Sequence, residues 1–136
     1  MKAPHLLRVE DPPESFSSLV EAARAEGLRI GWLELAEVSP LPEVLESAAG
    51  LGVLRAVSVG GGRTVAVKPL RGAPVLKDVL REHFLGCALV LVRGEEAAPR
   101  LRPEGEGWVM EIPEQAAQPL TMEQLLGKLR SPLPLT

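Results

Sequence analysis

The sequence predicts an α+β fold with a ferredoxin-like split βαβ core over residues 28–93. Three observations predict it. The elements in that stretch run in the order strand, helix, strand, strand, helix, strand. A glycine-rich connection joins the two middle strands, and a further strand and helix precede the core while a hairpin and helix follow it. A doubly wound, mainly parallel α/β sheet is the alternative, because a strand–helix unit also opens the chain.

The first elements are a short strand at residues 5–9 and a helix over residues 11–27. Asp11 and Glu14 have the spacing of a capping box, Pro12 suits the first turn, and Gly27 can end the helix. The apolar stripe expected on its buried face is Phe16, Leu19, Val20 and Ala23.

Residues 28–37, LRIGWLELAE, are nearly all apolar and predict a strand that lies centrally in a sheet. A helix of two to three turns should follow, with Ser39 as its cap, Pro40 in its first turn and a stop at Gly50 or Gly52.

The stretch VSVGGGRTVAVK predicts a β-hairpin that turns at Gly60 to Gly62. A three-residue loop pairs Val59 with Arg63 and places the valines on one face, which we expect to be core. The opposite face then holds small side chains, namely Ala56, Ser58, Thr64 and Ala66. A phosphate-binding glycine loop runs from a strand into a helix, whereas these glycines run into a strand, so the hairpin is favoured.

The second half continues with a helix at residues 73–86, a buried strand at 87–94, a hairpin that turns at 104–107, and a helix at 121–130. Gly86 should end the first of these helices, and Thr121 with Gln124 forms a capping box for the second. His83 is expected in the apolar stripe of the first helix. Residues 1–131 are predicted to be one domain and residues 132–136 a disordered tail.

The composition is that of a globular protein, with 136 residues, 46% hydrophobic and 24% charged. The longest apolar run, Cys87 to Val92, is too short to cross a bilayer, and the single cysteine excludes an internal disulfide, so we expect a cytoplasmic protein. The 13 prolines, together with no asparagine, resemble the bias of thermophile proteins.

The charges are segregated along the chain. Residues 55–102 carry nine basic and four acidic groups, whereas residues 1–54 carry four and nine, and residues 103–136 carry two and five. The basic middle segment makes Arg63, Lys68 and Arg71 the candidate ligand-binding residues for a small anion. Nucleic acid is an improbable partner, because the chain has two Trp and two Phe and no Tyr for stacking on bases.

The leading functional hypothesis is a non-enzymatic binding domain that associates with a second copy of itself or with a protein partner. Its contact surface would be the small-residue face of the hairpin, Ala56, Ser58, Thr64 and Ala66. The alternative is an enzyme or sensor for a small anionic ligand held by Arg63, Lys68 and Arg71, and weak nucleic-acid binding is third. We expect no cofactor and no metal, and no catalytic residue is assigned.

Overall fold

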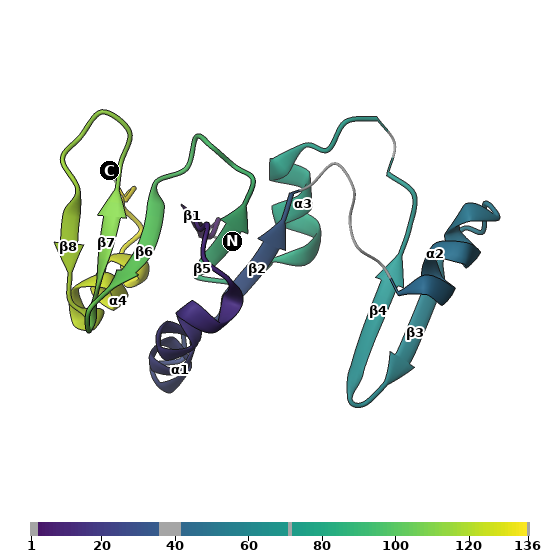
Figure 1. Cartoon of the computed structure of the whole chain (residues 1–136), viewed down its shortest axis with the longest axis horizontal. Helices are drawn as coiled ribbons and strands as arrows, with labels where there is room; N and C mark the ends of the chain where they lie inside the picture. Colours follow the sequence, from purple (N-terminus) through teal and green to yellow (C-terminus); the bar gives the residue numbers. More distant parts are fainter. Residues whose placement is uncertain (1–2, 36–41, 71, 136) are drawn as a thin grey trace. The chain divides into compact units, whose positions relative to one another are not determined.

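The computed structural model describes residues 3–35, 42–70 and 72–135. The chain forms two compact units. The main unit comprises Met1–Glu37 and Lys77–Thr136, and the hairpin unit comprises Val38–Leu76 (Figure 1). That residues 1–131 form one domain stays a prediction.

The main unit is built on a six-stranded mixed sheet with the strand order β2-β5-β1-β6-β7-β8. Its strands are β1 His5–Arg8, β2 Ile30–Glu34, β5 Leu89–Arg93, β6 Arg100–Glu104, β7 Gly107–Glu111 and β8 Gln118–Leu120. The first four strands in this order pair in parallel, and the last three pair antiparallel. The fold is therefore a mixed α/β arrangement.

The ferredoxin-like core is not formed. Strands β2 and β5 pair in parallel, and the two strands between them in sequence, β3 and β4, make a sheet of their own. The prediction that residues 28–37 form a central strand is also wrong. Strand β2 lies at the edge of the main sheet with half-buried side chains, while β5 lies between β2 and β1 and is buried on both faces from Leu89 to Val92.

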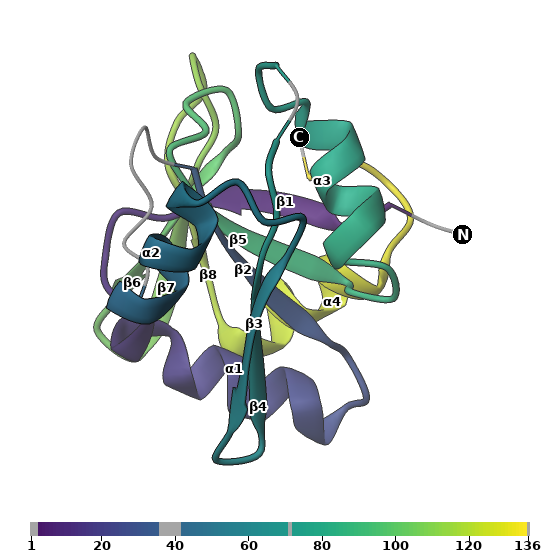
Figure 2. The same cartoon turned by 90° about the vertical axis from the view of Figure 1, so that its right-hand side faces the viewer.

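Helices cover the two faces of the main sheet. A 3₁₀ turn, η1 (Pro13–Phe16), leads into α1 (Ser17–Ala25), and α1 and α4 (Met122–Arg130) bury their apolar side chains in one core with the sheet. Helix α3 (Leu76–His83) lies on the opposite face (Figure 2). Just after this helix, Phe84 packs against Gly31 of β2. His83, expected in the apolar stripe of this helix, is instead exposed at 55% beside Glu82.

Two predictions about the C-terminal half are confirmed. The hairpin of β6 and β7 turns between Glu104 and Gly107 as expected, and the capping box of Thr121 and Gln124 begins α4. Strand β8 was not predicted, because three residues that include Pro119 give no periodic pattern. Leu135, in the segment expected to be disordered, is buried in the main core.

The hairpin unit contains α2 (Glu43–Gly50), β3 (Ala56–Gly60) and β4 (Arg63–Val67). The hairpin is confirmed, but its register is shifted by one residue, because the turn is the two-residue Gly61 and Gly62 pair and Gly60 is opposite Arg63. Both turn glycines have positive φ, of 58° and 76°, as a tight type I′ turn requires. The predicted helix cap Ser39 lies outside the described residues.

With this register, the hairpin has neither the valine face nor the small-residue face that the sequence predicts. Val59 is opposite Thr64, and Ser58 is opposite Val65, so each face mixes valines with small residues. Val57, Val59 and Val65 are exposed at 52%, 77% and 42%, so the predicted valine core of the hairpin is wrong. A one-residue change in loop length moves every side chain of one strand to the other face.

Candidate functional site

The carboxyl ends of the parallel strands are the usual ligand-binding edge of an α/β sheet. Here the connection between β5 and β6 crosses the end of β1. Its last residue, Pro99, accepts a 2.6 Å hydrogen bond from the Arg8 N–H, and Arg8 is opposite Arg100 in the sheet. Strand β6 begins where β1 ends, so six residues are enough to connect β5 to β6 with both strands running in the same direction. This connection itself occupies the carboxyl edge of the sheet.

Ion pairs also fill this edge. The Glu10 carboxylate lies 3.1 Å from Arg8 Nη1 and 2.8 Å from Arg100 Nε. The second contact does not have hydrogen-bond geometry, and the buried Nε atoms of Arg8 and Arg100 have no acceptor among the described residues. Both guanidiniums are therefore paired with Glu10, and Arg8 also lies 4.0 Å from Glu96, so we assign the two arginines a structural role.

Next to them, Arg102 Nε donates a 2.6 Å hydrogen bond to Glu111 Oε1. This hydrogen bond, strengthened by the charge of Arg102, lowers the pKa of Glu111 below its ordinary value, and it raises the pKa of Arg102. Arg102 also lies 3.3 Å from Glu104. One arginine thus connects two glutamates on the antiparallel half of the sheet.

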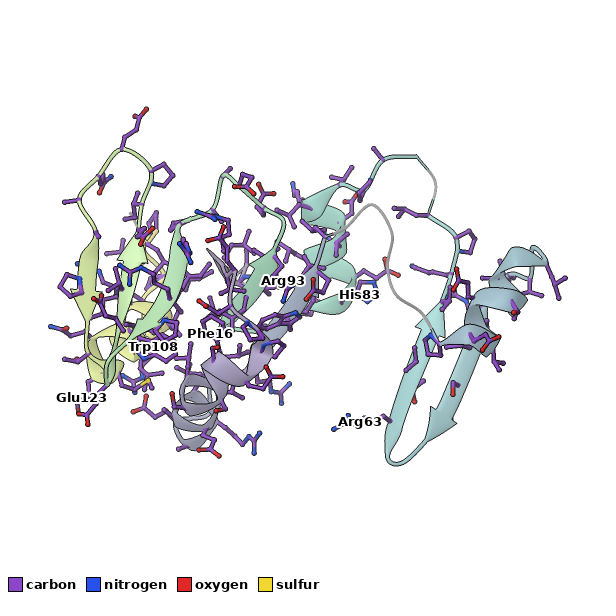
Figure 3. The ribbon with its side chains drawn as sticks, viewed as in Figure 1. Phe16, Arg63, His83, Arg93, Trp108 and Glu123 are labelled. Atoms are coloured by element: carbon purple, nitrogen blue, oxygen red, sulfur yellow. The ribbon has the colours of Figure 1, made fainter. Side chains whose placement is uncertain are left out.

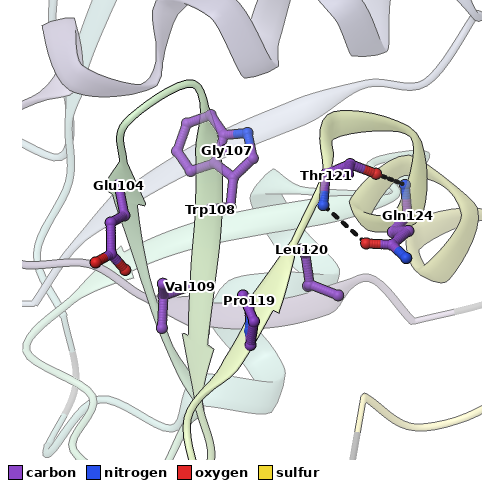
Figure 4. Close-up of a pocket in the computed structure, with 8 residues that line it drawn as sticks. All are labelled: Glu104, Gly107, Trp108, Val109, Pro119, Leu120, Thr121 and Gln124. Atoms are coloured by element: carbon purple, nitrogen blue, oxygen red, sulfur yellow. Dashed lines mark hydrogen bonds between the residues drawn. The ribbon is translucent and has the colours of Figure 1, made fainter.

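A hollow of about 360 Å³ lies where the β6–β7 turn meets β8 and the first turn of α4. We call it the indole pocket (Figure 4). Its lining residues are Glu104, Gly107, Trp108, Val109, Pro119, Leu120, Thr121 and Gln124.

Trp108 is the buried polar side chain of the indole pocket. The residue is 3% exposed, and its ring stacks on Phe16 with 5.8 Å between centroids and an interplanar angle of 17° (Figure 3). Its indole N–H has no acceptor among the described residues. Leaving such a donor unsatisfied costs about 1–3 kcal/mol, and the nitrogen is enclosed within the main core.

The backbone around the indole pocket is closely fixed. A Cβ atom on Gly107 would lie 2.9 Å from the Leu120 carbonyl oxygen, so only glycine allows this approach of β7 and β8. At the start of α4, the Gln124 N–H donates to Thr121 Oγ1 over 3.1 Å, and Gln124 Oε1 accepts from the Thr121 N–H over 2.9 Å. The positive end of the α4 dipole therefore faces this pocket.

A second hollow of about 260 Å³ lies at the amino ends of β1, β2 and β5. We call it the amino-edge pocket. Its lining residues are Ala3, Gly27, Leu28, Arg29, Gly86, Cys87, Ala88, Leu129 and Arg130. They combine apolar side chains with two guanidiniums and the thiol of the single cysteine, and none of the described lining residues carries a carboxylate.

The two arginines differ in their partners. Arg130 forms an ion pair with Glu26, whereas the exposed Arg29 side chain has no ion-pair partner among the described residues. Arg29 extends beside Gly86, where a Cβ atom would lie 3.8 Å from its Nη1. Helices α1 and α3 end near this edge, and their partial negative charges favour arginine there. At these ends, the carbonyl oxygens of Ala23, Arg24 and Phe84 accept from the N–H groups of Leu28, Gly27 and Cys87, respectively.

The structure places two of the three sequence-predicted ligand residues, Arg63 and Lys68, at opposite ends of β4. Arg63 lies at the turn of the hairpin and Lys68 follows the other end of β4, about 16 Å away along the strand (Figure 3). Lys68 lines a hollow of about 200 Å³ with Ala49, Gly52 and Val53, and Arg71 lies outside the described residues. As a trio for one small ligand, Arg63, Lys68 and Arg71 stay a prediction.

The predicted interface residues do not form one surface either. Ala56 and Ser58 are on one face of the hairpin, and Thr64 and Ala66 are on the other. Sequence reasoning missed Arg29, Arg130 and Trp108, because they lie on elements far apart in the chain and follow no motif. A homodimer or a protein partner stays a prediction.

Comparison with known proteins adds a distant likeness in structure. No protein-family model and no curated protein matches the chain. Among solved structures, a MobB protein homolog from Bacillus stearothermophilus matches with a TM-score of 0.42 and 23% identity, over 68% of this chain and 57% of that one. Bacillus subtilis MobB matches with a TM-score of 0.47 and 18% identity, over 71% of this chain and 64% of that one. The chain thus spans about three-fifths of the length of these proteins.

These findings correct the leading functional hypothesis. The small-residue face on which this hypothesis depended does not form, because its four residues lie on two faces of the hairpin. The prediction of a non-enzymatic interaction domain with this contact surface is therefore wrong.

The described residues contain neither a membrane-spanning helix nor a cluster of metal-ligating side chains. None of the helices in these parts of the chain combines the length and apolar character needed to span a bilayer. In the same residues, no three His, Cys, Asp or Glu side chains are grouped as metal ligands would be. The cytoplasmic location stays a prediction.

Proposed function

We propose that the chain binds a small anionic ligand in the amino-edge pocket, with Arg29 as the principal contact. The observation that carries the proposal is the Arg29 guanidinium, which lines a hollow and has no ion-pair partner among the described residues. A guanidinium offers five N–H donors in a planar fork that matches a carboxylate or a phosphate. Such an anion would accept hydrogen bonds from this fork.

The second guanidinium supports the same ligand class. Arg130 is 49% exposed in its ion pair with Glu26, so it can share its donors with a ligand at the pocket. Leu28, Leu129 and Ala88 supply an apolar wall. The best ligand is therefore a carboxylate or phosphate that carries a small apolar group.

Cys87 provides a test that does not require the natural ligand. It is the only cysteine of the chain and lines the pocket, so alkylation reports on this place alone. Iodoacetate and iodoacetamide have nearly the same shape, but only iodoacetate carries a carboxylate. The quantity measured is the alkylation rate with iodoacetate divided by the alkylation rate with iodoacetamide. At Cys87 we expect this ratio to be about five times that of a neutral cysteine peptide, because an unpaired charge a few ångströms away contributes about 1 kcal/mol.

Two variants locate the effect. Arg29→Gln should bring the ratio close to that of the peptide, whereas Arg93→Gln, which removes an arginine paired with Glu34 on the main sheet, should leave it unchanged. The enhancement should also fall as salt is added. A wild-type ratio equal to that of the peptide would mean that the helix ends cancel the charge of the arginines, and the proposal would be abandoned.

A further inference from the structure

We propose that the hairpin unit binds the surface of a lipid bilayer that contains anionic headgroups. The proposal starts from the distribution of exposed apolar side chains. Among the described residues, eleven large hydrophobic side chains are exposed, and nine of them belong to the hairpin unit. A monomeric protein rarely exposes so much aliphatic surface in one unit, so this unit needs an apolar partner. It shares no residue with the amino-edge pocket, and the inference is therefore independent of the anion proposal.

One face of the hairpin has no cover within the unit. Helix α2 packs on the face that carries Ala56 and Val67, because Ala56 is buried and Val67 borders the hollow of about 200 Å³ together with Ala49 of α2. Side chains alternate between the two faces of a strand, so two other pairs of the register lie on the opposite side. The side chains of these pairs are all exposed, and we call them the open face: Val57, Val59, Thr64 and Ala66.

The exposed aliphatic side chains do not line one groove. Leu51 and Leu54, which lie between α2 and β3, are 82% and 79% exposed and extend the apolar surface beyond the strands. The hollow beside α2 is too small to hold a helix or a strand of another protein. A fluid bilayer needs no preformed groove, because lipid molecules adapt to the shape of the side chains that enter them. The arrangement therefore favours a lipid surface over a folded protein or a peptide.

The charges of the hairpin specify an anionic lipid. Residues 51–77 contain five Lys or Arg and no Asp or Glu. Of the five, Arg55 and Arg63 are exposed and have no ion-pair partner among the described residues, and the Arg63 side chain extends outward from the turn (Figure 3). The acidic residues of the unit, Glu43 and Glu46, are on α2 and hence on the covered side of the hairpin. Each basic residue close to an anionic bilayer strengthens binding about fivefold.

The outer edges of the two strands limit how deeply the hairpin can enter. In the described part of the chain, β3 and β4 pair only with each other, so their outward N–H and C=O groups must stay hydrated. The hairpin therefore lies flat among the headgroups, with the open face toward the acyl chains and both strand edges in the water-rich layer. In this orientation Val57 and Val59 reach the hydrocarbon boundary, and Arg55 and Arg63 lie at the level of the lipid phosphates.

The test is sedimentation of the full-length protein with lipid vesicles. One set of vesicles contains phosphatidylcholine and phosphatidylserine, and the other contains phosphatidylcholine alone. We expect at least about tenfold tighter binding to the set with phosphatidylserine, and we expect added salt to weaken it. Val59→Ser removes an apolar side chain of the open face, and Arg63→Gln removes a charge at the turn. Each substitution should weaken binding about fivefold.

Two variants of the main unit are matched controls. Leu133→Ser removes an aliphatic side chain that is 69% exposed, and Arg24→Gln removes an exposed arginine of α1. Both should bind the vesicles as the wild type does. Thermal unfolding checks that all four variants are folded.

Three results would overturn the proposal. The protein could stay in the supernatant with both vesicle sets at low salt, which is the outcome expected if a second copy, a peptide or another protein covers the open face. It could bind the two vesicle sets equally, which would exclude the anionic headgroup as the partner. The control variants could also weaken binding as much as the hairpin variants do, which would place the contact outside the hairpin unit.

Discussion

Gly94 is the residue at which the main sheet can least accept a side chain. Its φ is +97°, and a Cβ atom there would overlap the carbonyl oxygen of Leu35, which follows β2. We expect Gly94→Ala to lower the free energy of unfolding by about 3 kcal/mol, from the backbone conformation and the displacement of backbone together. Chemical denaturation measures this change.

Gly105→Ala is the matched control for this variant. Gly105 also has positive φ, +58°, but a Cβ atom there would meet nothing within 4 Å. Gly105→Ala should lower the free energy of unfolding by about 1 kcal/mol, because only the unfavourable backbone conformation contributes. Equal losses in the two variants would show that the close approach to Leu35 contributes nothing.

The Arg102–Glu111 pair gives a prediction about pH. The pKa of Glu111 is lowered in the folded protein from a reference of 4.5, mainly by the hydrogen bond from Arg102. A lowered folded pKa stabilises the protein above the unfolded value, and this contribution disappears as the pH falls through the folded pKa. The stability difference between wild type and Glu111→Gln should therefore shrink from pH 6 to about pH 3.

Urea denaturation of both proteins at several pH values measures that difference. The side chains of Arg102 and Glu111 are 32% and 36% exposed, so solvent screening should keep the effect small. Glu106→Gln, in the turn between the same strands, serves as a control for the loss of one carboxylate. A difference that is constant with pH would contradict the assigned cause.

At the scale of the element, α4 depends on its capping box. The Thr121 hydroxyl accepts from the Gln124 N–H, and the Gln124 side chain accepts from the Thr121 N–H. We expect Thr121→Ala to cost about 1 kcal/mol of stability, measured by thermal or urea unfolding, because a helix N–H loses its acceptor. Thr121→Ser keeps the hydroxyl and should retain most of the stability, and an equal loss in both variants would exclude the cap as the cause.

Elements with strong local signals could be predicted from the sequence. The capping box of α4, the stop at Gly86 and the hairpin turn before Gly107 all depend on residues within one turn of each other. The register of β3 and β4 could not be predicted in this way, because three consecutive glycines allow a two-residue or a three-residue turn. The structure chooses Gly61 and Gly62, and this choice moved every predicted interface residue of one strand to the other face.

At the scale of the whole molecule, the order of the strands follows from contacts that the sequence does not display. The pairing of β1 with β6 depends on a single bridge, Arg8 opposite Arg100, and on the short connection that ends at Pro99. The two candidate pockets have the same origin. Arg29 and Arg130, or Trp108 and Thr121, become neighbours through the sheet and carry no signal in the linear sequence.

The two units should differ in local stability. Strand β5 is paired on both sides and its residues from Leu89 to Val92 are at most 1% exposed, whereas β3 and β4 pair only with each other in the described residues and bury Ala56 alone. A two-stranded hairpin is marginally stable without a large apolar face. We expect the hydrogen-bonded amides of β3 and β4 to exchange at least about a hundredfold faster than those of β5, when corrected for intrinsic rates.

Gly62→Ala, at a φ of +76° with open space around it, should accelerate exchange in the hairpin and leave β5 unchanged. Equal protection in the two units, or acceleration of β5 by that substitution, would mean that the chain opens as one cooperative body.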